Sequence, residues 1–148
     1  MRKALSLLIV AVLLSAAGAE AKTFLSIATG GVAGVYYPLG GGLAQVINNH
    51  VADVEVTAET GNASAANINL IAGREVTMGL VQNDVAFRAV KGMKPFKQPV
   101  TNLRIIASLY PEHVQCITTK ASGIKTISDL KGKRVSVGAP GSGVADSL

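Results

Sequence analysis

Runs of β-branched and apolar residues alternate along this chain with stretches in which apolar residues recur at helical spacing. The runs predict six strands, over residues 23–28, 54–58, 76–81, 103–109, 114–119 and 134–138. The stretches between them predict helices over 38–49, from the turn 61–64 to about 73, over 84–91, at a short turn 128–131 and after the turn 140–143. This alternation is typical of an α/β fold built on a largely parallel sheet.

Three elements carry further sequence signals. The run 76–81 is almost continuously apolar, so we expect it to be a central strand. Asn62 and Ser64 are expected to cap the helix that follows them, and Asp84 is expected to cap the next helix. Residues 91–102 contain two prolines and three lysines and predict a polar connection.

The first 21 residues have the parts of an export signal. Arg2 and Lys3 precede an apolar stretch over 4–17, and Ala19 and Ala21 are the small residues that a signal peptidase reads. A membrane anchor is the alternative, but the apolar stretch is shorter than the roughly 20 residues that a spanning helix needs. No cysteine follows it that could carry a lipid. We therefore expect cleavage after Ala21 and a soluble periplasmic protein without a lipid anchor.

Composition excludes several classes of function. Removing residues 1–21 takes two of 14 basic and one of 9 acidic residues, which leaves 12 − 8 = +4, and the basic residues are scattered among few aromatics. That pattern does not favour nucleic-acid binding. Cys116 is the only cysteine and lies in an apolar run, so we expect a buried side chain and no intramolecular disulfide. His50 and His113 lie far apart without a metal-binding motif, so neither a metal nor a cofactor is expected.

Two glycine-rich turns, at 29–34 and 138–143, each connect a predicted strand to a predicted helix. Backbone N–H groups at such a turn can bind an anion, although glycine also simply permits a tight turn. Both turns follow the carboxyl ends of predicted parallel strands, where open α/β sheets bind ligands. Tyr36 and Tyr37 lie beside the first turn, and Gln82 follows the third predicted strand.

Known nucleotide-binding and nucleophile motifs do not match these turns. The first turn has the spacing Gly-Gly-x-x-Gly in place of GxGxxG, and Gly132-Lys133 is followed by Arg134 in place of the Ser or Thr of a Walker A motif. Pro140 stands where a nucleophile elbow has its first glycine. An exported hydrolase that uses Ser142 remains an alternative, but neither histidine is placed to act as its base. We therefore expect a binding protein and not an enzyme.

Four motifs together carry a family resemblance: the turn 29–40, the strand exit 81–86, the turn 109–112 and the run 129–143. With them the chain resembles the TAXI family, the solute-binding receptors of a subclass of TRAP transporters. The resemblance implies a type II periplasmic-binding-protein fold of two α/β lobes joined by a hinge. It implies a signal peptide over 1–21, a first lobe over 22–108, and a hinge crossover with the start of a second lobe over 109–148. Family members are about twice this length, so we expect the second lobe to be truncated here.

The resemblance also implies a ligand, a partner and a set of contacts. The ligand would be a small organic anion such as glutamate, glutamine or a related dicarboxylate or oxo-acid, delivered to TRAP membrane subunits that an ion gradient drives. No arginine clamp can be placed, because Arg74, Arg88 and Arg104 are expected in surface or helix roles. The expected ligand contacts are Thr29, Gly31, Tyr36, Tyr37, Asn62, Ser64 and Gln82 in the first lobe, and Ser142 and Gly143 in the second.

Overall fold

The computed structural model describes residues 21–147, and the predicted signal peptide, apart from Ala21, lies outside them. Three parallel strands form one sheet in the order β2-β1-β3. These are β1 (Thr23–Ala28), β2 (Val54–Glu59) and β3 (Met78–Gly79). β1 pairs with β2 along its whole length, whereas β3 pairs only with the last two residues of β1. The predicted α/β class is confirmed for the described residues.

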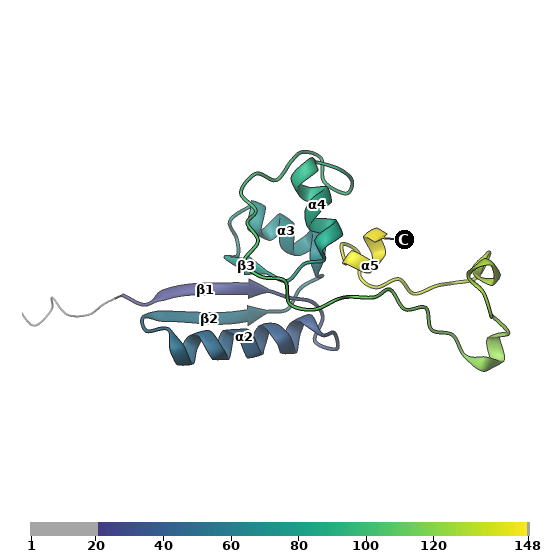
Figure 1. Cartoon of the computed structure of the whole chain (residues 1–148), viewed down its shortest axis with the longest axis horizontal. Helices are drawn as coiled ribbons and strands as arrows, with labels where there is room; N and C mark the ends of the chain where they lie inside the picture. Colours follow the sequence, from purple (N-terminus) through teal and green to yellow (C-terminus); the bar gives the residue numbers. More distant parts are fainter. Residues whose placement is uncertain (1–20, 148) are drawn as a thin grey trace, which may run out of the picture.

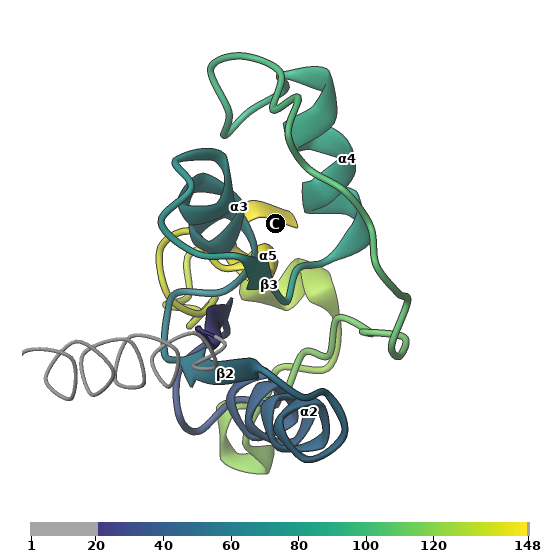
Figure 2. The same cartoon turned by 90° about the vertical axis from the view of Figure 1, so that its left-hand side faces the viewer.

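Helices cover both faces of this sheet. α2 (Tyr36–His50) lies on one side, and α3 (Ser64–Ala72) and α4 (Asn83–Lys91) lie on the other (Figure 2). The core between the sheet and α2 contains Ile27, Tyr36, Ala44, Val56 and Leu80. A second core joins α3 to α4 and contains Ala65, Ile68, Val85, Ala86, Ala89 and Phe96. The helices predicted over 38–49, to about 73 and over 84–91 match α2, α3 and α4 within two residues.

A buried asparagine of α3 fixes the carboxyl edge of the sheet. Asn67 is 0% exposed, and its Nδ2 group donates to the carbonyls of Ala28, Thr29 and Leu80 at 3.1, 2.9 and 2.8 Å. These carbonyls belong to the ends of β1 and β3, and those of Ala28 and Thr29 also accept from the backbone N–H groups of Leu80 and Ala63. The asparagine therefore holds both strand exits beside the start of α3.

The prediction of a central third strand is wrong. β3 spans only two residues and lies at one edge of the described sheet, and β1 is the central strand. Val76 and Leu80 are buried as the apolar run suggested. Burial by helices produces the same apolar pattern as burial between two neighbouring strands, so the pattern alone could not distinguish them.

The predicted helix caps are also wrong. The N-cap residues are Ala63 for α3 and Gln82 for α4, and neither makes a side-chain capping bond. The first N–H groups of α3, at Ala65 and Ala66, instead donate to the carbonyl of Gly141 at 2.9 and 3.4 Å. Asp84 lies in the first turn of α4, two residues after the N-cap, and pairs with Arg88 at 2.9 Å. A residue distant in sequence has thus replaced the local cap of α3.

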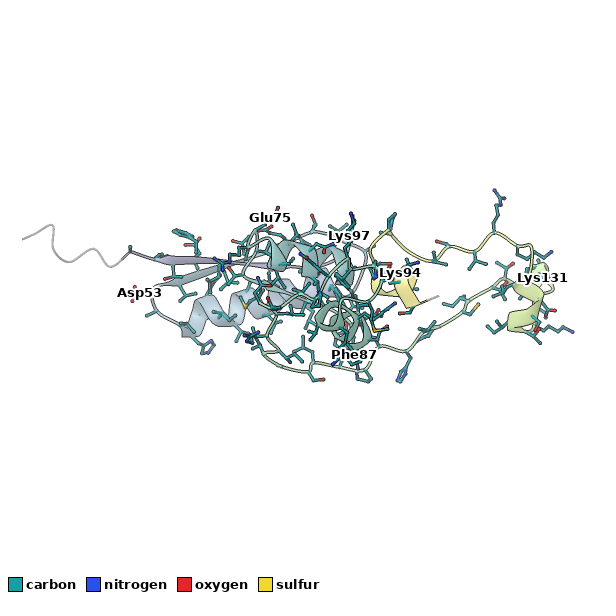
Figure 3. The ribbon with its side chains drawn as sticks, turned by 90° about the horizontal axis from the view of Figure 1, so that it is seen from above. Asp53, Glu75, Phe87, Lys94, Lys97 and Lys131 are labelled. Atoms are coloured by element: carbon teal, nitrogen blue, oxygen red, sulfur yellow. The ribbon has the colours of Figure 1, made fainter. Side chains whose placement is uncertain are left out.

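Residues 113–139 form an extended arm that runs away from the α/β body and returns to it (Figure 1). The arm contains two short 3-10 turns, η2 (Lys120–Ser122) and η3 (Ile127–Leu130), the second of which confirms the helical turn predicted at 128–131. Figure 3 shows Lys131 at the far end of the arm, away from Phe87 and Lys94 on the body. After the arm, α5 (Gly143–Ser147) confirms the helix predicted after the second glycine turn.

The strands predicted over 103–109, 114–119 and 134–138 are absent from the described structure. β-branched residues there favour extended backbone, but a strand also needs a neighbour with which to form hydrogen bonds, and none of the described residues supplies one. Apolar side chains are consequently left in solvent, with Ile105 86% and Ile117 88% exposed. Cys116 lies on this arm and is exposed, so the prediction that it is buried is wrong for the same reason.

Candidate ligand-binding site

A pocket of about 220 Å³ lies at the carboxyl edge of the sheet. The first glycine turn contributes residues 30, 31 and 34–36, and the start of α3 contributes residues 63 and 64. Gln82 comes from the exit of β3, Glu112 from the segment before the arm, and residues 142–144 from the second glycine turn. Five segments that are far apart in sequence therefore meet where parallel α/β sheets bind ligands.

Six of the nine predicted contacts line this pocket: Gly31, Tyr36, Ser64, Gln82, Ser142 and Gly143. Two of them are joined directly, because the backbone N–H of Gln82 donates to Ser64 Oγ at 3.0 Å. That bond attaches the exit of β3 to the first turn of α3.

The structure does not bring Thr29, Tyr37 or Asn62 into the pocket. Thr29 is fully buried, and its hydroxyl donates to the carbonyl of Glu59 at 2.6 Å. This hydrogen bond joins the end of β1 to the end of β2. Tyr37 and Asn62 are exposed and are not among the lining residues. Neighbouring helix residues point in different directions, so Tyr36 packs inward while Tyr37 faces solvent.

Glu112 is a pocket residue that the sequence reasoning missed. Tyr36 Oη donates to Glu112 Oε2 at 2.7 Å, and Tyr110 Oη donates to Glu112 Oε1 at 3.1 Å. Within the set of lining residues Glu112 is the one with a charged side chain. The motif 109–112 marked this segment as a turn, but pairing with a tyrosine 76 positions earlier requires the fold.

Both phenols that hold Glu112 stay protonated well above neutral pH. Burial, followed by the hydrogen bond to Glu112, raises the pKa of Tyr36 far above its ordinary value. Burial also raises the pKa of Tyr110, to about 12, with the nearby Glu112 carboxylate adding to the effect. A negative phenolate is costly in an apolar setting and beside a carboxylate. Each tyrosine therefore remains a hydrogen-bond donor to Glu112.

Gly143, in the second glycine turn, lies close against Gln82 and Ser64. A Cβ on Gly143 would overlap Gln82 Oε1 and would lie 2.9 Å from Ser64 Oγ. Gly138 and Gly141, with φ of 93° and 81°, have left-handed backbone that a larger residue adopts only at a cost. The second turn thus needs glycine for backbone conformation at two positions and for space at a third.

Polar contacts hold α5 and this turn against the body. Arg88 Nη1 donates to the carbonyl of Asp146 at 2.6 Å, and Ser147 Oγ donates to Asp84 Oδ2 at 2.9 Å. Arg88 is therefore a structural link between α4 and α5, in agreement with the helix role expected for it. Because Gly141 accepts from the first N–H groups of α3, that helix start is already occupied by the protein itself.

A larger cavity of about 320 Å³ lies elsewhere, between residues 72–74 and 98–102. It is formed mainly by consecutive residues of one loop and contains none of the predicted contacts. Of residues 21–147, no three acidic, histidine or cysteine side chains gather as a metal site would require. In the same range, no helix has the length and apolar character needed to cross a bilayer. The pocket at the sheet edge is therefore the candidate site.

A protein-family model, that of the NMT1-like family, matches residues 27–148. The chain belongs to the NMT1-like family. This is a family of solute-binding proteins. The match begins in β1 and extends through α5, so it includes every residue that lines the pocket of this NMT1-like protein.

Proposed function

We propose that this protein is a periplasmic receptor that captures a small organic anion. The observation that carries the proposal is the pocket itself, which the two glycine turns and the exit of β3 form together at the carboxyl edge of the sheet. Membership of the NMT1-like family supports a binding role. The export signal over 1–21 supports the periplasmic location.

The size and polar groups of the pocket suit a small carboxylate. A volume of about 220 Å³ is below the roughly 300–1,000 Å³ of pockets for drug-sized ligands, so one amino acid or dicarboxylate is the appropriate scale. The hydroxyl groups of Ser64 and Ser142 line it and can donate to carboxylate oxygens, because each accepts from a backbone N–H and keeps its own proton free to donate. The resemblance to the TAXI family implies glutamate, glutamine and related dicarboxylates or oxo-acids, and these are the ligands we propose.

The transport partner follows from the motifs that resemble the TAXI family. These motifs include the first glycine turn, the strand exit with Gln82, the turn with Glu112 and the run that ends in the second glycine turn. We propose that the receptor delivers its ligand to TRAP membrane subunits driven by an ion gradient.

We also propose the two-lobe arrangement of type II binding proteins. Residues 22–108 would form the first lobe, and residues 109–148 the hinge crossover and the start of the second. Exposed apolar residues before and along the arm, such as Ile105, Ile106 and Ile117, support this, because a second lobe would cover them. Ligand would then select the closed arrangement by its greater affinity for it.

Thermal unfolding of the purified chain in the presence of amino acids and dicarboxylates tests the proposal. A ligand at 100 times its dissociation constant should add about 2.7 kcal/mol to the free energy of unfolding. Ligand recovered unchanged after long incubation would support a receptor. A complete panel without any stabilisation would contradict the proposal.

The alternative of a hydrolase that uses Ser142 gains no support. No histidine is among the residues that line the pocket, and Ser142 Oγ accepts from the backbone N–H of Ala145 at 3.3 Å. His50 contacts the carbonyl of Val46 at the other end of α2. We therefore do not propose an enzymatic activity.

A further inference from the structure

Glu112 gives the pocket a charge that a simple anion site would avoid. Its side chain is the single charged group among the lining residues, and it is negative when ionised. A ligand that carried only carboxylate groups would be repelled by it at short range. A ligand that also carried an ammonium group would be attracted to it.

The two phenols fix the position of this carboxylate. Tyr36 and Tyr110 each donate to a different oxygen of Glu112, at 2.7 and 3.1 Å. A carboxylate has about four acceptor positions, so each oxygen can accept a further hydrogen bond from a ligand. The carboxylate is thus held in place before ligand binds, which lowers the entropic cost of the contact.

Gln82 also lines the pocket, but its side-chain oxygen does not face the space that a ligand would fill. Gln82 Oε1 is buried and has no hydrogen-bond partner among the described residues. It lies against Gly143, where a Cβ would overlap it. The exposed carboxylate of Glu112 is therefore the side-chain acceptor in the pocket that a ligand amino group can reach.

We propose that Glu112 selects a ligand that carries an ammonium group, so that the pocket takes an α-amino acid in preference to the oxo-acid or dicarboxylate of the same skeleton. The inference rests on the proposed function, because it names the ligand class of the same site. The hydroxyl groups of Ser64 and Ser142 bind the ligand carboxylate, and Glu112 accepts from the ligand amino group. The opposing view is that Glu112 only joins α2 to the segment before the arm.

Isothermal titration of the full chain with matched ligand pairs distinguishes these views. The probes are glutamate, leucine and alanine, each paired with the oxo-acid in which a carbonyl replaces the amino group. The unmodified protein should bind the amino acid of the best pair at least about tenfold more tightly than its oxo-acid. Glu112→Gln keeps the shape and removes the charge, so it should weaken amino-acid binding by about tenfold or more and leave oxo-acid binding equal or stronger.

Two control variants accompany this measurement. Glu75→Gln makes the same change at an exposed position outside the pocket and should alter neither affinity. Tyr110→Phe removes one donor to Glu112 but keeps its charge, so the preference for amino acids should persist. Thermal unfolding of each variant confirms that it is folded.

The outcomes separate the two proposals. If no probe binds the unmodified protein, the proposed function fails, and this inference fails with it. If the probes bind but Glu112→Gln weakens both members of a pair equally, or changes neither, the receptor function stands and the selective role of Glu112 is overturned.

Discussion

Asn67 is the residue on which the geometry of the pocket depends most. It is fully buried and joins the exits of β1 and β3 through three carbonyl groups. Asn67→Ala should lower the free energy of unfolding by about 3 kcal/mol, because three hydrogen bonds to buried carbonyls would be lost together with the packing of a fully buried side chain. Chemical denaturation measures this. Asn69→Ala on the exposed side of the same helix is the matched control and should cost less than about 0.5 kcal/mol; similar losses in both variants would contradict the role of Asn67.

Tyr36 makes stability depend on pH in the alkaline range. Its pKa is raised from 10.0 in the folded protein, so the folded state keeps the phenol proton where the unfolded chain loses it. The resulting stabilisation is complete below about pH 10 and is lost as pH rises through the folded pKa. Tyr36→Phe should therefore flatten the decline of stability above about pH 10. Parallel denaturation curves for both proteins across that range would show that burial does not shift this phenol.

The sequence identified some of the residues that line the pocket, but not all of them. Tyr36, Ser64, Gln82 and Ser142 could be found because each lies next to a predicted strand exit or glycine turn. Thr29 has the same sequence context, but its hydroxyl is used to join two strands. Glu112 could not be found, because its place depends on a contact between distant segments.

At the scale of elements, two neighbouring glycines of α2 differ in their surroundings: Gly40 packs against the end of β1, whereas Gly41 faces open space. A Cβ on Gly40 would lie 2.5 Å from Thr29 Cγ2, whereas one on Gly41 would meet nothing within 4 Å. Gly41→Ala should raise the free energy of unfolding by about 0.5–1 kcal/mol, because alanine favours helix. Gly40→Ala should lower it by about 1–3 kcal/mol through overpacking. Denaturation of the two variants should give opposite signs, and equal signs would refute the packing of α2 against the end of β1.

The spacing of apolar residues predicted the helices that pack against the sheet correctly, and it predicted strands wrongly where no neighbouring strand exists among the described residues. The helices α2, α3 and α4 each bury one side, so their apolar spacing carried a clear signal. β3 and the extended arm contain apolar runs as strongly β-like as β1. Whether such a run becomes a strand depends on a neighbouring strand, and that is a property of the tertiary structure.

At the scale of the whole molecule, the arm should be the first site of proteolysis. It has no strand pairing in the described structure, and its cleavable side chains are exposed or nearly so. Trypsin at low ratio should cut at the basic residues of the arm, Lys120, Lys125, Lys131, Lys133 and Arg134, before it cuts within the body. Mass spectrometry of the first fragments identifies the sites. First cleavage within α2, α3 or α4 would mean that the body is less stable than the arm.

The α/β class and the elements β1, α2, β2, α3 and α4 could be predicted because local patterns and a compact core agree over residues 23–91. The course of residues 103–139 could not, because their apolar side chains have no partner among the described residues. The pocket lies between these regions, where the second glycine turn returns to α3 and α4. Its position is therefore the part of the account that most needs a direct measurement.

Amide NMR of the chain titrated with glutamate provides that measurement. Saturable shifts should appear at Gly31, Ser64, Gln82, Glu112 and Ser142, which line the pocket. They should be lost in Gly143→Ala, whose Cβ would overlap Gln82, and kept in Gly41→Ala. Saturable shifts confined to residues 98–102 of the larger cavity, or binding undiminished in Gly143→Ala, would contradict the account.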